Sequence, residues 1–326
     1  MINYIKASVK RMSFDIFIHE KTNNLKLRKV IEFLLVPAGF IYLIILYLKN
    51  IYYEYISNNS YINELSVVSI VKDEGAYLEE WIEYHRLIGI NKFYIYDNES
   101  DDQTFTILQP YIEKGIVTYI KIKGKVRQLD AYNDSLDKYG LNNKYLIYLD
   151  ADEFIYCRDN LKNKINSLMV DRVACLKVNW LIFGSSGFEK KQNGFVTQNF
   201  IYRSEYDFEK NSHIKSICNP RRIIGFLNPH YPIILPKFKS INTKNHEVKG
   251  AFSAFSDKYF RINHYFTKSK EEFIKKKGRG MADNLKIRSL NDFKTHDRNE
   301  VLDQGMYKYK EKLEEIVRGC NSSSGR

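Results

Sequence analysis

The sequence predicts an α/β fold in which a mainly parallel central sheet is flanked by helices. Apolar runs of strand length alternate with segments of helical period through four units, and polar clusters follow several of the strands. Hydrophobic residues make up 44% of the 326 residues, which is enough for a substantial core. Ligands of such sheets bind beyond the carboxyl ends of the strands, so we expect the polar clusters to converge on one crevice.

The elements of the first half follow from local patterns. Short apolar, β-branched runs bounded by turn residues predict strands at 65–71, 92–96, 116–122 and 145–149. Apolar residues at helical spacing predict helices at 76–88, 103–114 and 127–139. Beyond Phe154 the pattern predicts a strand at 173–180, short β-like runs between 195 and 265, and helices at 268–277 and 299–317.

The remaining segments are predicted to be irregular. Residues 181–187 are rich in Gly and Ser and predict a flexible loop. Residues 321–326 predict a disordered tail. We divide the chain into a basic, hydrophobic segment at 1–60 and a main domain at 61–320. No internal repeat or heptad pattern is present, so no oligomeric state is predicted.

Two carboxylates, Asp150 and Asp152, end the most apolar strand. In extended chain they point the same way, roughly 7 Å apart, and hard oxygen ligands suit Mg²⁺ or Mn²⁺ with a phosphate-bearing substrate. A solvated turn is the alternative. Because a second acidic loop, 97–102, follows a neighbouring strand, we expect a metal–diphosphate site. Asp152 would bind the metal, and Asp150 would hold the ribose or a metal-bound water.

Polar side chains of the neighbouring loops are further candidates for binding a substrate. The loop that begins at Asp97 contributes Asn98, Ser100 and Asp102, which could hold a nucleobase or ribose or serve ordinary turn and capping chemistry. Two basic residues, Lys72 and Arg127, are candidate phosphate contacts or plain surface charges.

Residues farther along the chain could complete the site. On the helix after the third strand, Gln128 could face the crevice, whereas Asn133 could face solvent. Imidazoles could complete a metal site: His264 is our first choice because Lys268 follows it, and His230 is the second; either could also be structural. Trp180 could stack on a sugar ring or belong to the core.

Charge and cysteine content narrow the functional class. The formal net charge is +12, which fits a lysine-rich surface, an anionic membrane face or an anionic substrate. No basic arm, zinc pattern or RNA-binding aromatic motif is present, so we expect no nucleic-acid partner. Four cysteines without a C-x-x-C pair indicate neither zinc nor a redox pair and fit free thiols in a reducing compartment.

An ordered series of blocks between about 65 and 280 resembles glycosyltransferase family 92 and its bacterial relatives in the family-2-like group. The series is more specific than any one block. It consists of Val71-Lys72-Asp73-Glu74 with 77–85; Tyr96-Asp97-Asn98 with Ser100 and Asp102; Gln128, Asn133 and Asp134; 150–154; Asn179-Trp180 with 183–187; 215–220; and His264-Tyr265 with Lys268-Ser269.

The resemblance implies a GT-A fold whose Asp-x-Asp holds Mn²⁺ or Mg²⁺ and a UDP-sugar. It implies transfer of a sugar, with galactose the best-known donor sugar of the family, and inversion at the anomeric carbon. It adds Glu74 and Lys215 to the candidate donor-binding residues. One departure is Asp73, where the family usually has Asn; Asp has the same shape as Asn but carries a charge.

The mechanism that this resemblance implies needs a carboxylate to take the proton of the acceptor hydroxyl. Three carboxylates follow the Trp180 loop, namely Glu189, Glu205 and Asp207. We expect a metal-dependent glycosyltransferase acting on a glycan or lipid-linked glycan in surface polysaccharide or lipopolysaccharide synthesis. The alternatives are a metal-dependent phosphodiesterase or nucleotidyltransferase, and a degenerate membrane-bound nucleotide-sugar-binding protein.

The uncharged run at 33–48 indicates a membrane-associating helix. It starts too far from Met1 for a signal peptide, and its length of about 24 Å is short of a roughly 30 Å hydrocarbon core. An interfacial helix, a full span and a buried helix of a soluble domain remain open. By the positive-inside rule a span would place the main domain outside, away from bacterial nucleotide sugars, so we expect a peripheral anchor on the cytoplasmic face.

Overall fold

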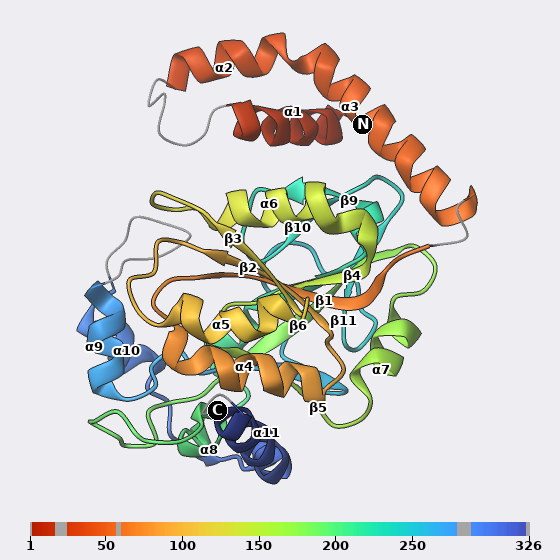
Figure 1. The fold of residues 1–326 in the computed structure, drawn as a ribbon. Helices are drawn as coiled ribbons and strands as arrows, with labels where there is room; N and C mark the ends of the chain where they lie inside the picture. The colour runs from red at the N-terminus through yellow and green to blue at the C-terminus, as the bar shows by residue number, and fades with distance from the viewer. Residues whose placement is uncertain (1, 17–24, 57–59, 279–287, 324–326) are drawn as a thin grey trace.

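The centre of the molecule is a nine-stranded sheet in the order β3-β2-β1-β4-β8-β6-β12-β5, with β11 pairing with β6. Figure 1 shows the computed structural model, which describes residues 2–16, 25–56, 60–278 and 288–323. Only β8 and β5 run antiparallel to their neighbours, so the predicted mainly parallel sheet is confirmed. The strands are β1 (Asn63–Val71), β2 (Lys92–Asp97), β3 (Val117–Lys121), β4 (Asn143–Tyr148), β5 (Glu153–Cys157), β6 (Val173–Ile182), β8 (Ile214–Cys218), β11 (Lys239–Asn242) and β12 (Phe260–His264).

Helices cover both faces of this sheet, so alternate strand residues enter two different core layers. Helices α4 (Gly75–Leu87) and α5 (Thr104–Glu113) cover one face, and α6 (Gln128–Tyr139) covers the other (Figure 1). Val67 and Ile147 pack in the layer with α4 and α5, whereas Val68 and Leu146 pack in the layer with α6. Burial on both faces explains why the strands read as continuous apolar runs.

The local patterns of the first half are confirmed, and those of the second half only in part. The four predicted strands and three predicted helices are β1 to β4 and α4 to α6. The helix predicted at 299–317 is wrong at its start, because Val301–Leu302 forms strand β13 with β7 (Tyr202–Arg203). The smaller elements are α7 (Leu161–Leu168), α8 (Val196–Asn199), β9 (Ile223–Phe226), β10 (Pro232–Ile234), α9 (Lys270–Gly278), α10 (Leu290–His296), η5 (Gly305–Tyr309) and α11 (Lys310–Ser323).

Two further predictions need correction. The Gly-Ser segment 181–187 is no free loop: the backbone N–H groups of Ser185 and Ser186 donate to Asp297 (2.6 Å) and Asn299 (2.8 Å). The predicted disordered tail is helical as far as Ser323, within α11, and 324–326 lie outside the described residues. Cysteines distant in sequence also meet, since Cys175 and Cys218 face each other as free thiols in β6 and β8.

The amino-terminal helices pack on the same side of the molecule as α6 (Figure 1). They are α1 (Ile2–Ile16), α2 (Leu25–Leu34) and α3 (Val36–Ile51), which continues into the π-helical turn η1 (Tyr52–Ile56). Buried Arg11 of α1 donates to Asp137 of α6. Leu43 of α3 packs with Ile224 and Leu235 in a separate small core.

Burial of His85 in α4 makes stability depend on pH. Its Nδ1–H donates to the Trp81 carbonyl (2.8 Å), and Nε2 accepts from the N–H of Ile155 (3.4 Å), so the ring is neutral. Burial lowers its pKa to about 3. The folded-state pKa lies below the unfolded one, so the stabilisation is complete above the unfolded pKa and is lost as pH falls toward the folded one.

We predict that His85 alone lowers the free energy of unfolding by about 3 kcal/mol between about pH 7 and pH 4. Urea unfolding at stepped pH measures this slope. His85→Gln should flatten the slope, whatever it does to stability at neutral pH, whereas His246→Gln at an exposed position should not. An unchanged slope in His85→Gln would show that other groups cause the acid sensitivity.

Candidate active site

The loops after β1 and β2 are fastened to each other at the carboxyl edge of the sheet. The backbone N–H of Asp73 donates to the Ser100 hydroxyl (2.9 Å), and the N–H of Asp101 donates to the Asp73 carboxylate (2.8 Å). Asp102 accepts from the N–H of Gly75 at the start of α4 (2.9 Å). A Cβ on Gly75 would lie 2.7 Å from the backbone of α5, so the two loops form one close-packed surface.

The departure at Asp73 is explained by its backbone. Its φ is +51°, in the left-handed region where Asn and Asp are the commonest residues besides Gly. Its side-chain oxygen accepts from a backbone N–H, and an Asn oxygen would do the same. Asp therefore preserves both the conformation and the loop contact that Asn would provide.

The side chains of Asp97 and Asn98 form hydrogen bonds within the protein. Buried Asp97 accepts from the backbone N–H of Ser100 (3.0 Å) and from the Tyr119 hydroxyl. Asn98 donates to two backbone carbonyls of the segment after β3, at 3.1 and 2.9 Å. These contacts shape the crevice at the end of β2. A direct role in donor binding for Asp97, Asn98, Ser100 or Asp102 stays a prediction.

A buried ion cluster forms where β4 ends. The Lys215 ammonium of β8 lies 2.8 Å from Asp150 Oδ2 and 3.7 Å from Glu153 Oε2. Gln128 Nε2 donates to the other Asp150 oxygen (2.9 Å). The N–H of Asp150 donates back to Glu153 (3.0 Å), which closes the turn. Each oxygen of Asp150 therefore accepts a hydrogen bond, one from Lys215 and the other from Gln128. Gln128 thus points toward the end of β4, and its role in donor binding stays a prediction.

The protonation of this cluster follows from its burial. Burial lowers the pKa of Lys215, but Asp150 and Glu153 raise it, and the net pKa is well above its usual value. Burial raises the pKa of Glu153. Lys215 lowers this pKa, but Asp150 and Asp152 raise it, and the net pKa is well above its usual value. The cluster therefore favours the charged pair Lys215–Asp150.

Asp152 faces a different set of partners on the opposite side of the turn. One carboxylate oxygen lies 3.6 Å from His264 Nε2, and the other accepts from the Lys276 ammonium of α9. Burial raises the pKa of Asp152, but Lys276, His264 and Lys268 lower it, and the net pKa is well below its usual value. Asp152 is therefore an ionised carboxylate beside lysine side chains.

The donor set at Asp152 fits a divalent cation bound by two protein ligands. A carboxylate and an imidazole face each other, and within the described ranges His264 Nδ1 is buried without a hydrogen-bond partner. No group of three or more His, Cys, Asp or Glu among the described residues is arranged to hold a metal. Mn²⁺ or Mg²⁺ held here would take its other ligands from phosphate and water.

An aromatic wall adjoins this pair. The Trp180 ring lies 4.4 Å from the His264 ring and stacks on His213 at 5.0 Å between centroids. His230 contacts Trp180 edge-on and makes no described contact with Asp152, so its role as a metal ligand stays a prediction. Burial lowers the pKa of His213 and His230 to about 4, so both rings are neutral at pH 7 and suit a neutral ligand such as a sugar.

Among the basic candidate residues, Lys268 lies in the site, whereas Arg127 and Lys72 lie on the segments around it. Lys268 is buried and lies 3.6 Å from Glu74, with its ammonium 3.7 Å from the centre of the Tyr77 ring, so this part of the predicted set does meet. Arg127 at the start of α6 pairs with Asp130 (3.0 Å). Lys72 is half-buried just after β1. Phosphate roles for Lys72 and Arg127 stay predictions.

Asn133 does not face solvent, so that alternative was wrong. Its side chain is buried; it donates to the Phe226 carbonyl (2.9 Å) and accepts from the Phe226 N–H (2.8 Å). The residue thus fixes α6 to β9. These contacts show a structural role, and a role in binding the donor stays a prediction.

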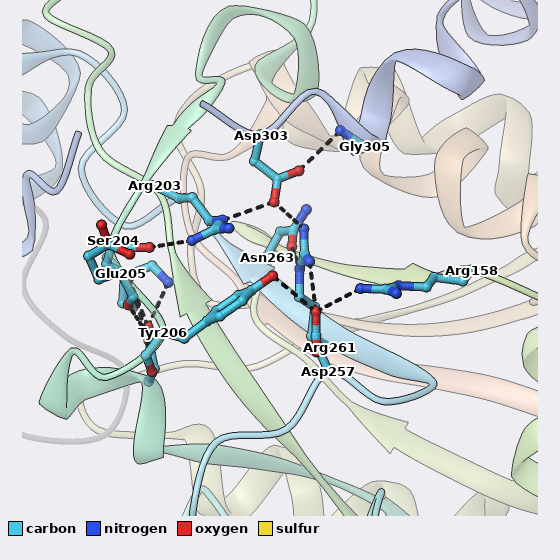
Figure 2. Close-up of polar contacts among 12 residues, drawn as sticks. Arg158, Arg203, Ser204, Glu205, Tyr206, Asp257, Arg261, Asn263, Asp303 and Gly305 are labelled. Atoms are coloured by element: carbon cyan, nitrogen blue, oxygen red, sulfur yellow. Dashed lines mark hydrogen bonds and ion pairs between the residues drawn. The ribbon is translucent and has the colours of Figure 1, made fainter. Parts of the chain in front are cut away.

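The candidate bases lie on a rim rather than in the ion cluster. Glu205 and Asp207 are exposed between β7 and a short 3-10 turn at Glu209–Ser212. Figure 2 shows Glu205 beside a network in which Asp303 accepts from Arg203 (3.0 Å) and Arg261 (2.6 Å). This network fixes the backbone before Glu205. No described contact joins either carboxylate to Asp152.

Lys276 is the residue of the site that sequence reasoning missed. It stands in the run Lys275-Lys276-Lys277, and composition alone does not indicate which of these three lysines faces the site. Helical spacing does indicate which one. Buried Glu272 and Phe273 lie on the inward face of α9, and Lys276, four residues after Glu272, lies on the same face. The periodicity therefore contained a signal for which lysine faces the site.

Comparisons place the site within a matched region. A family model described as glycosyltransferase family 92 matches residues 68–299. A glycosyltransferase family 92 protein of Ricinus communis is 24% identical over 213 residues, which cover 61% of this chain and 38% of that protein. A galactan beta-1,4-galactosyltransferase of Arabidopsis thaliana is 33% identical over 103 residues, covering 28% of this chain and 20% of that protein.

The likeness to solved structures is distant. The crystal structure of S. aureus TarS 1-349 matches with a TM-score of 0.37 and 13% identity, covering 65% of this chain and 63% of that chain. In all these alignments the chain covers less than two thirds of its relative's length, and well under half for the curated relatives above.

We predict that Lys215→Met destabilises the fold by about 3 kcal/mol, because it leaves Asp150 without the ammonium group that pairs with it. Adding Asp150→Asn should restore part of that loss in urea unfolding. The matched control is Lys177→Met, which removes a buried lysine that donates to a backbone carbonyl. Its combination with Asp150→Asn should be additive. Additivity for Lys215 as well would contradict the ion cluster.

Proposed function

The chain belongs to glycosyltransferase family 92, and from this premise we propose that it transfers a sugar from a UDP-sugar to a hydroxyl of a glycan or lipid-linked glycan. The observation that carries the proposal is ionised Asp152 facing His264 and Lys276 at the carboxyl edge of the sheet. Galactose is our choice of donor sugar, supported by the galactosyltransferase among the relatives. We place the reaction in surface polysaccharide or lipopolysaccharide synthesis.

We propose that Asp152 and His264 hold Mn²⁺ or Mg²⁺. When bound, the ion would supply Lewis-acid neutralisation of the departing diphosphate. Lys276 and Lys268 lie beside Asp152 and Glu74, where their ammonium groups would pair with phosphate oxygens and stabilise the charge that develops on UDP.

The other residues would position the reactants. Asp150, fixed by Lys215 and Gln128, would accept a hydrogen bond from the ribose or from a water. Trp180, which is half-buried, would pack against a sugar ring. For an inverting reaction the acceptor hydroxyl attacks the face opposite UDP, and a carboxylate takes its proton; we assign this base to the segment that carries Glu205 and Asp207.

Family membership favours sugar transfer over the rival chemistries. A phosphodiesterase or nucleotidyltransferase would use the same carboxylates to break or form a bond at phosphorus. Incubation with a UDP-sugar and an acceptor separates the two: transfer of the sugar supports our proposal, and transfer of the nucleotide contradicts it. A degenerate binding protein would release no UDP at all.

Asp152→Asn should lower metal-dependent UDP release at least about 100-fold, because the amide loses the charge that holds the cation and its counter-ions. The assay measures UDP from UDP-galactose with Mn²⁺ added and with a chelator. Asp159→Asn, at an exposed carboxylate that pairs with Lys164 at 3.6 Å, is the matched control. Near-wild-type turnover of Asp152→Asn would remove the residue from the metal role.

Lys276→Met should separate two effects of one ammonium group. Because Lys276 occupies a carboxylate oxygen of Asp152, its loss should tighten the binding of Mn²⁺ alone, by about threefold to tenfold. The same change should weaken UDP binding in saturating Mn²⁺, because a phosphate partner is lost.

Calorimetry and Mn²⁺ relaxation measure these two affinities without turnover. Lys275→Met on the exposed face of α9 is the control and should change neither. Weaker binding of both ligands to Lys276→Met would indicate a merely structural lysine.

A further inference from the structure

The continuous helix formed by α3 and η1 is long enough to span a membrane, and its contacts with the rest of the protein show whether it can do so. The continuous helix Val36–Tyr55 contains 20 residues and is apolar enough to cross a bilayer, and 17% of its most apolar window is buried. At 1.5 Å per residue it is about 30 Å long. Length and composition alone therefore do not distinguish a spanning helix from one that lies on the surface.

One side of this helix packs on α1 at its amino-terminal end and on the catalytic domain from Leu43 onward. The residues that face the protein recur every three or four positions, which is one stripe of a helix. A Cβ on Gly39 would lie 2.5 Å from Val9 of α1, which shows how closely the two helices approach. The stripe consists of Gly39, Leu43, Tyr47, Asn50 and Glu54.

Polar contacts fasten the carboxyl half of the stripe. Asn50 is buried and donates to the Arg221 carbonyl (3.2 Å), and Glu54 pairs with Arg222 (2.5 Å). Tyr47 donates to a backbone carbonyl just after β10 (3.0 Å). A bilayer could surround this helix only if these bonds were broken and Asn50 were moved into hydrocarbon. The docked structure is therefore incompatible with a full span.

The opposite side of the helix is apolar and exposed. Exposed fractions reach 76% for Phe33 and are still 42% for Val36. A helix of a soluble domain places polar residues on its outer face, and a stripe of this size marks an interaction surface. The stripe runs from α2 into η1 and consists of Val30, Phe33, Leu34, Val36, Phe40, Ile41, Ile44, Ile45, Leu48, Ile51, Tyr52 and Tyr55.

Exposed lysines border the apolar stripe. Lys29 precedes it in α2 and Lys49 lies near its end in α3, both exposed. Exposed Lys237 of the catalytic domain lies beside the docked side of the helix, 5.9 Å from the Tyr47 ring. Apolar side chains bordered by basic ones match an anionic lipid surface. Pairing of the same surface on two copies would bring these like charges together, which disfavours a dimer.

We propose that α2 and α3 form an in-plane anchor that binds the surface of an anionic bilayer. Their exposed apolar side chains enter the acyl boundary, the bordering lysines meet lipid phosphates, and the docked stripe keeps the catalytic domain on the same side. The surface is outside the donor site, so this inference goes beyond the proposed function.

Co-sedimentation of the full-length chain with phosphatidylcholine vesicles, with and without phosphatidylglycerol, tests the anchor. We expect reversible binding that anionic lipid strengthens and salt weakens. Ile41→Asp with Leu48→Asp should lower the partition coefficient at least about tenfold without lowering the melting temperature. Val170→Asp, at an exposed apolar position elsewhere on the domain, should leave binding unchanged.

Three outcomes would overturn the inference. They are absence of vesicle binding by the wild-type chain, lipid-free dimerisation that the double variant abolishes, and association that resists alkaline carbonate as a spanning helix does. The inference is separable from the proposed function, because UDP release into water by the double variant should match that of the wild type. Vesicle binding by a chain that releases no UDP would contradict only the proposed function.

Discussion

The buried ion pair between Lys215 and Asp150 is the interaction on which the site depends. The turn after β4 places three carboxylates within a few residues, and such a turn is stable at a buried strand end only with a counter-charge. The antiparallel strand β8 lies between β4 and β6 and supplies it. With one oxygen on Lys215 and the other on Gln128, Asp150 fixes the turn so that Asp152 faces His264 on β12.

Helix α6 connects this cluster to the rest of the molecule. Its first residue, Gln128, contacts Asp150; one turn later Asn133 bonds the backbone of β9; and Asp137, on the next turn, pairs with Arg11 of α1. These contacts lie on a single helix, so the docked amino-terminal helices and the crevice have a fixed relative position. Under the proposed function and anchor, this fixed position would set the height of the crevice above the bilayer.

Sequence patterns over consecutive residues predicted the strands and helices of the first half of the domain. The strands β1 to β4 and helices α4 to α6 could be predicted because burial on two faces and helical spacing are visible in consecutive residues. The strand-end rule then placed Asp152 at the same edge as the loops at 72–74 and 97–102. Partners from remote segments could not be predicted in this way. Lys215 is 65 residues from Asp150 and Lys276 is 124 residues from Asp152. The error at 181–187 has the same origin, because Gly and Ser indicate flexibility only when no distant segment, here 297–299, accepts their backbone N–H groups.

The charges of the site explain why donor and cation would bind together. Without ligands, Lys276 pairs with Asp152 and Lys268 lies beside Glu74, so each of these four side chains lies beside one of opposite charge. A cation alone would have to displace an ammonium group from Asp152 and leave it in a site of low polarity, which is costly. A diphosphate alone would have to draw the lysines away from carboxylates that then lack a counter-charge. If both ligands bound, Lys276 would exchange the Asp152 carboxylate for a phosphate, and the charge of Asp152 would be balanced by the cation instead of by Lys276. Neither Asp152 nor Lys276 would then lack a counter-charge, so the lysine that opposes each ligand separately would favour the two together.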